Sequence, residues 1–326
     1  MNSENTHWDI RHLREHLHFA IQLEYWTVPF YMSAMYSIKD PTSDAYKLVQ
    51  SVVYQEMLHI QLACNAANAF GTKIDLEHAF ISPPYEGQKV PHLCFTKGET
   101  GRDPVDPGQS YEPYSAEIGP LDESRINAMC LIEYPEDDVN EPPKLMQDVT
   151  EYSSIGEFYR AVLFGATQHV GDIQANHNQV EIFKNFYRHF PSQTITERGV
   201  AGLNQVIDVI NAITDQGEGV RRMDTIPLEY RNTADGFNSD EDHFAKFNQI
   251  KNLTEKPECY SGIPDPQPGS AGDEAQKTLL RSFERFRKDM VTLFNGTRPK
   301  EFGPNMAILG GNILNCWKSG AIPRFS

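Results

Sequence analysis

The chain has 326 residues, of which 39% are hydrophobic, so it can bury a substantial core and disorder throughout its length is excluded. Its net charge of −16, without a dense run of Lys or Arg, argues against nucleic-acid and anionic-membrane partners. The five cysteines form no Cys-x-x-Cys pair, which argues against a zinc knot or a disulfide scaffold.

The start of the chain and its hydropathy pattern bear on the compartment. The N-terminus is polar and acidic rather than basic and then apolar, and no window approaches 18 uninterrupted apolar residues. Together with scattered cysteines, which suit a reducing compartment, this pattern predicts a cytoplasmic protein without a membrane segment.

The first predicted helix covers residues 9–37, with Asp9 as its cap. One stripe of this helix is apolar except for Glu24. A buried carboxylate is costly unless it is neutralised, paired or bound to a metal. Glu24 is therefore a candidate ligand.

The second predicted helix covers residues 43–70 and ends before Gly71. A short connection makes it an antiparallel neighbour of the first. Glu56 and His59 lie three residues apart on its apolar stripe, so both side chains can reach one metal ion from a single face. The alternative is a buried hydrogen-bonded pair without metal.

The same spacing occurs between Glu15 and His18. Glu15 lies nine residues before Glu24, which places it roughly 180° away around the helix. We expect Glu15 to face solvent, so its surroundings distinguish it from Glu56.

Residues 71–152 are rich in Pro, Gly, Asp and Tyr and predict a long irregular insertion. A short strand is predicted within it at residues 128–134. Because the insertion is too long for an ordinary connection, we expect it to cover a functional site.

The third and fourth bundle helices are predicted at residues 154–170 and 201–215. In an up-and-down bundle they run antiparallel, so Glu157 at the start of one lies near Glu218 just past the end of the other. The long loops on either side leave room for His243 to join them.

Glu157 and Glu218 each have a competing interpretation. Ser154 and Glu157 match a capping box, in which the acid only bonds the helix start. Glu218 also fits a turn between two glycines. Asp240 precedes His243 by three residues and competes with Glu218 as a ligand.

A short helical piece is predicted at residues 240–250, followed by C-terminal helices at about 274–294 and 306–317. No boundary separates a second domain, so residues 1–326 are predicted to form a single mainly α domain, a four-helix bundle with the insertion and these additional helices.

The candidate residues combine carboxylates with imidazoles, a donor set that favours iron, or manganese, over zinc-thiolate or calcium sites. We expect one or two ions with open positions for dioxygen. The predicted ligands are Glu24, Glu56, His59, Glu157, Glu218 and His243.

Six segments carry a resemblance to a known family. They are HLHFAIQLEYWTVPFY (16–31), QEMLHIQL (55–62), LIEYPE (131–136), SIGEFYRA (154–161), INAITDQGEG (210–219) and HFAKFNQI (243–250). In this order they resemble the ferritin-like domain family related to iminophenyl-pyruvate dimer synthase, of the violacein and rebeccamycin pathways. The resemblance implies a ferritin-like four-helix bundle with a carboxylate-histidine metal centre.

The sequence departs from that family in two respects. The pathway enzymes carry this domain within a larger polypeptide, and Asp240 stands where a second Glu-x-x-His pair would have Glu. A shared scaffold does not carry a substrate with it, so indole coupling is only one option.

We therefore expect a metal-dependent, non-haem di-iron oxidoreductase of specialised metabolism, acting with dioxygen on a small, aromatic or amino-acid-derived metabolite, as a monomer or a homo-oligomer. The alternatives are metal storage without an organic substrate and a metal-free helical interaction protein.

Overall fold

The computed structural model describes residues 7–76, 108–135, 143, 145–149, 152, 154–187, 189–217, 226–231 and 238–326. Every regular element longer than an isolated bridge in these ranges is a helix, which confirms the predicted mainly α fold. None of the helices is long and apolar enough to cross a membrane within these ranges.

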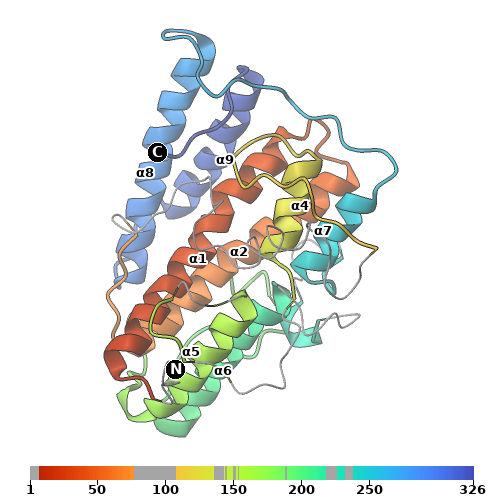
Figure 1. Ribbon diagram of the computed structural model, residues 1–326. Coiled ribbons are helices and arrows are strands. Elements are labelled where there is room, and N and C mark those ends of the chain that lie inside the picture. Colours follow the sequence, from red (N-terminus) through yellow and green to blue (C-terminus); the bar gives the residue numbers. More distant parts are fainter. Residues whose placement is uncertain are drawn as a thin grey trace.

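Two long helices form the centre of the molecule. Helix α1 spans Ile10–Ser37 and begins at Asp9, whose side chain accepts from the N–H of His12. Helix α2 spans Asp44–Ala69 and begins at Ser43. The two pack antiparallel along most of their length (Figure 1). The predicted bounds of 9–37 and 43–70 are thus close to the observed ones.

The other two columns of the bundle are each divided into two helices. Helices α5 (Ile155–Gln168) and α6 (Gly199–Gln216) pack together beside one half of the central pair, and α4 (Glu123–Ile132) and α7 (His243–Asn252) beside the other half (Figure 1). The N–H of His243 donates to the carbonyl of Gly217 at 3.0 Å. Helix α7 therefore starts where α6 stops, although a long excursion separates them in the sequence.

The strand predicted at residues 128–134 is wrong, because most of this stretch belongs to α4. Asp122 caps the helix by accepting from the N–H of Arg125 at 3.0 Å. Residues 126–132 are all buried, so this part of the helix has no solvent-facing side to give it a helical period. A short apolar run of this kind does not distinguish a buried helix from a buried strand. Residues 77–107 and 136–142 of the insertion lie outside the described residues.

The remaining described elements are two short 3-10 turns and two C-terminal helices. Two short 3-10 turns occupy Val170–Asp172 and Leu228–Tyr230. Helices α8 (Ala271–Phe294) and α9 (Phe302–Lys318) pack against each other, and also against α2 and α1 respectively. Trp317 fixes α9 to α1, since its buried Nε1–H donates to the carbonyl of Ser33 at 2.9 Å.

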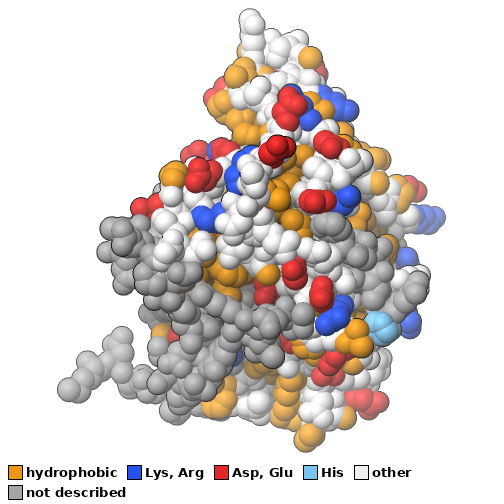
Figure 2. Space-filling model, turned by 90° about the vertical axis from the view of Figure 1, so that its right-hand side faces the viewer, with side chains coloured by type: hydrophobic (Ala, Val, Ile, Leu, Met, Phe, Trp, Pro, Cys, Tyr) orange, Lys and Arg blue, Asp and Glu red, His pale blue; other side chains and the backbone are white. Residues whose placement is uncertain are grey.

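Acidic and basic side chains are interspersed over the face of the molecule shown in Figure 2. Among the residues described on this face, no continuous basic surface appears.

Candidate metal centre

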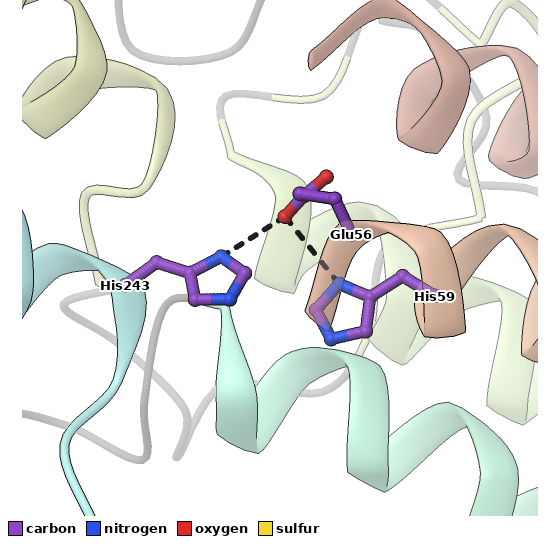
Figure 3. Close-up of side chains that lie close together, drawn as sticks. All are labelled: Glu56, His59 and His243. Atoms are coloured by element: carbon purple, nitrogen blue, oxygen red, sulfur yellow. Dashed lines mark ion pairs between the residues drawn. The ribbon is translucent and has the colours of Figure 1, made fainter. Parts of the chain in front are cut away.

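Three predicted ligands from α1 and α2 lie together in the core. Glu24, Glu56 and His59 are 5%, 2% and 1% exposed. The three-residue spacing on α2 points both of its side chains to the same side, as the helical pattern predicts. His243, which is fully buried at the first position of α7, faces them from the opposite column (Figure 3).

Glu56 lies between the two imidazoles. Its Oε1 is 3.5 Å from His59 Nδ1 and 3.0 Å from His243 Nδ1 (Figure 3). His59 Nδ1 is also 3.4 Å from Glu24 Oε2, and His243 Nδ1 is 3.5 Å from Glu133 Oε2. Each histidine thus has one carboxylate of its own and shares Glu56 with the other.

Glu133 is absent from the predicted ligand set. It follows the last residue of α4, is 3% exposed, and its Oε1 accepts from the hydroxyl of Tyr31 at 2.6 Å. A single carboxylate at the end of the apolar run 128–132 is the signal that could have identified it. The incorrect strand prediction did not identify Glu133 as a ligand. The position directly after the last residue of a helix is what directs this side chain towards the bundle.

A hydrogen-bond chain fixes the orientation of His59. Its Nε2–H donates to Gln216 Oε1 at 2.9 Å, and the amide of Gln216 donates to the carbonyl of Tyr230. Because an amide oxygen only accepts, His59 carries a proton on Nε2 and directs Nδ1 at Glu24 and Glu56. Outer partners of this kind are typical of metal-bound histidines.

Two hydroxyl groups hold the carboxylates in place. Thr27 Oγ1 donates to Glu56 Oε2, and the hydroxyl of Tyr159 donates to Glu24 Oε1. In each case one oxygen is held by the hydroxyl while the other faces a histidine.

The charges of the cluster shift the pKa values of its members. Burial alone would raise the pKa of Glu56, but His243 and His59 outweigh it and lower the pKa to about 2. Burial would lower the pKa of His59, but Glu24 and Glu56 raise it to about 10. Burial raises the pKa of Glu24, in opposition to His59. The histidine Nδ1 atoms therefore attract a cation, which is a proton or a metal ion.

The arrangement fits a metal better than it fits hydrogen bonding alone. Nε2 of His243 is buried and has no hydrogen-bond partner within the described part of the chain, while its Nδ1 faces two carboxylates. Such orphaned polar atoms are rare and costly. Donors bound to one ion at about 2.1 Å lie roughly 3 Å apart, close to the spacing of these Nδ1 and carboxylate atoms. Ligand atoms of Glu56, His59 and His243 all lie within 4.8 Å of one another.

A small cavity adjoins these donors. Its volume of about 20 Å³ is enough for roughly one water-sized group. Glu24, Glu56 and Glu133 contribute its polar wall, while Leu23 and Ile213 contribute to its apolar wall.

Glu157 and Glu218 are the other two predicted ligands. Glu157 lies buried in the first turn of α5, where its N–H donates to Ser154 Oγ at 2.9 Å, so the Ser154 half of the capping box is present. Its carboxylate remains a predicted ligand. Glu218 lies outside the described residues.

Asp240 does not share a helix face with His243, because α7 begins at His243 rather than at residue 240. The carbonyl of Asp240 accepts from the N–H of Ile226 at 2.9 Å. Asp242 caps the helix instead, accepting from the N–H of Ala245 at 2.7 Å. The spacing argument for Asp240 therefore fails, since it requires both residues to be helical.

The competing pair at the start of α1 behaves as expected. Glu15 is exposed and forms an ion pair with Arg11 at 2.9 Å. Its orientation towards solvent is confirmed.

Comparisons with known proteins agree with this fold. A family model described as "Ferritin-like" matches residues 17–252, which include all four columns of the bundle. The crystal structure of a ferritin like protein from Caulobacter vibrioides has a TM-score of 0.80 to this chain and is 41% identical, covering 98% of this chain and 99% of that one. No curated protein matches. The narrower resemblance to iminophenyl-pyruvate dimer synthase stays a prediction.

Proposed function

Because the chain belongs to the ferritin-like family, we propose that its buried cluster is a dinuclear metal centre and that the protein is a non-haem iron oxidoreductase. The observation that carries the proposal is the position of Glu56 Oε1 between two Nδ1 atoms, each with a further carboxylate of its own. One ion would be held by Glu24, Glu56 and His59, and the other by Glu56, Glu133 and His243.

The surrounding residues support redox chemistry at such a centre. When bound, two iron ions supply electrons in pairs to dioxygen. Thr27 and Tyr159 hold the carboxylates in one orientation, and Leu23 and Ile213 exclude bulk water from the cavity. Glu157 and Glu218 are retained as additional ligands in this proposal.

A small, aromatic or amino-acid-derived metabolite is the proposed substrate class. The cavity beside the donors has room only for a water-sized group such as dioxygen. An organic substrate would therefore lie outside this cavity, next to the small group that the cavity holds.

Metal storage is the second candidate, because the cavity beside the donors has no room for an organic substrate. The two functions differ in stoichiometry and in turnover. A redox enzyme keeps a fixed number of ions and consumes dioxygen repeatedly with a reductant, whereas a storage protein takes up and releases many ions.

Metal analysis of protein from iron-supplemented cells tests the proposal. We expect about two iron ions per chain in the wild type and near-complete loss in Glu56→Ala and in the isosteric Glu56→Gln. Glu15→Ala is the matched control, since it removes an exposed acid with the same spacing to a histidine, and it should retain wild-type metal. Full metal content in folded Glu56→Gln would contradict the assignment.

A further inference from the structure

A second cavity lies on the other side of the central helix pair. Its volume is about 320 Å³, and it is formed by α1, α2, α8, α9 and the segment 183–187. It shares no lining residue with the cavity at the metal centre. Small-molecule sites begin at about 300 Å³, so this apolar pocket has the size of a ligand site.

The lining of the apolar pocket is specific in its chemistry. Four of its fourteen residues are methionines and six are aromatic. None of the fourteen, all in the described part of the chain, carries a charge. Methionine adapts its shape to a ligand and makes favourable sulfur contacts with aromatic rings. These features together select for an uncharged aromatic compound.

A few uncharged polar groups accompany the apolar surface. Gln50 and Tyr36 lie in the wall, and burial raises the pKa of Tyr36 to about 12, so its hydroxyl stays neutral. Apolar sites with a small number of polar groups are typical of small-molecule recognition.

The pocket has a fixed floor and a more exposed rim. Met35, Leu309 and Phe286 are buried below it. At the rim Tyr54 and Phe186 are 43% and 48% exposed. The segment carrying Phe186 is anchored to α2 through the N–H of Ile182, which donates to the side chain of Gln61 at 2.8 Å. A ligand that enters between Tyr54 and Phe186 therefore binds in a pocket that is already formed.

We propose that this apolar pocket binds an uncharged, hydrophobic aromatic small molecule at a site separate from the metal centre. A protein partner fits less well, because a stable interface buries about 800 Å² on each side. Here the apolar surface is concave, and only a few large apolar side chains, such as Tyr54, Phe186 and Ile308, stand exposed around it.

Fluorescence titration with the neutral dye N-phenyl-1-naphthylamine tests the proposal on the full chain. We expect saturable binding near one dye per chain. Ala307→Trp should weaken it at least tenfold, because Ala307 is exposed and lines the pocket, so a larger side chain fills the space without disturbing the core. Asn315→Trp is the matched control, an exposed position on the same helix outside the lining, and should bind dye like the wild type.

A second variant, on α2 rather than α9, tests whether the pocket requires an uncharged lining. Gln50→Glu places a charge in the pocket at a half-buried position of α2 and should weaken dye binding without a change of volume. Absence of saturable binding to the wild type, or equal binding to all four proteins, would overturn the proposal. A wild-type dimer that Ala307→Trp dissociates, with no dye bound, would overturn it in favour of a second copy of the chain.

Discussion

At the scale of single residues, the two outer carboxylates of the cluster differ from the central one. Glu24 and Glu133 each face one histidine, whereas Glu56 faces both. Removing an outer carboxylate should therefore impair one half of the centre, and removing the central one should impair both.

Glu133→Gln tests this difference. We expect it to lower the metal content from about two ions to about one per chain, because Glu24, Glu56 and His59 still hold the other ion. Elemental analysis of the purified protein measures the result. Glu123→Gln, an exposed position on the same helix, is the control and should keep the full content. Wild-type content in Glu133→Gln would exclude Glu133 as a ligand.

His16 gives the chain a pH-dependent stability away from the cluster. It is fully buried, and burial lowers its pKa to about 4. A folded-state pKa below the unfolded value means that the stabilisation is complete above about pH 6.5 and is lost as the pH falls towards 4. At pH 5 the loss amounts to roughly 2 kcal/mol.

His16→Gln should remove that part of the pH dependence. Urea unfolding at pH 7 and pH 5 measures it: the drop in unfolding free energy should be smaller in the variant by roughly 2 kcal/mol. The exposed His177→Gln should leave the drop unchanged. Equal drops in the wild type and His16→Gln would show that another group titrates.

At the scale of elements, α9 carries two neighbouring glycines in opposite surroundings. A Cβ at Gly310 would lie 2.3 Å from the hydroxyl of Tyr36, whereas a Cβ at Gly311 would meet nothing within 4 Å. Gly310 therefore lets α9 approach α1 closely, and Gly311 only weakens the helix.

The two alanine variants should change stability in opposite directions. Gly310→Ala should lower the unfolding free energy by about 1–3 kcal/mol through overpacking. Gly311→Ala should raise it by about 0.5–1 kcal/mol through helix propensity. Thermal or urea unfolding measures both, and Tyr36→Phe in the Gly310→Ala background should recover part of the loss. The same sign for both variants would refute the close approach.

The helices that the sequence predicts well are the long ones, in which an apolar stripe extends over several turns. Helices α1, α2, α8 and α9 lie within a few residues of their predicted bounds, because caps such as Asp9 and Ser43 and an apolar stripe mark them. Helix α4 has no such stripe. Glu133 and the start of α7 at His243 depend on packing between distant segments, which single-sequence patterns do not contain.

At the scale of the whole molecule, the cluster joins all four columns of the bundle, since its carboxylates and histidines come from α1, α2, the end of α4 and the start of α7. An ion bound there contacts the folded state only, because the unfolded chain does not assemble the ligands. Metal binding should therefore stabilise the entire fold.

Unfolding with and without manganese(II), which does not undergo redox cycling here, measures that stabilisation. At a free metal concentration one hundred times the dissociation constant, the unfolding free energy should rise by about 2.7 kcal/mol for each ion bound. A chelator should abolish the gain, and Glu56→Gln should show none. A gain of equal size in Glu56→Gln would place the stabilising ion elsewhere.

Two columns of the bundle each consist of two helices, and this arrangement affects how the protein can change in evolution. The cavity at the centre is lined by Glu133 at the end of α4, Ile155 at the start of α5 and Gly217 at the end of α6, and His243 returns to Gly217. Both excursions of the chain therefore depart from the centre and come back to it. Residues can be added or removed within them without shifting the register of the helices that carry the ligands. Evolution can thus rebuild the approach to the centre while the donor atoms stay where they are.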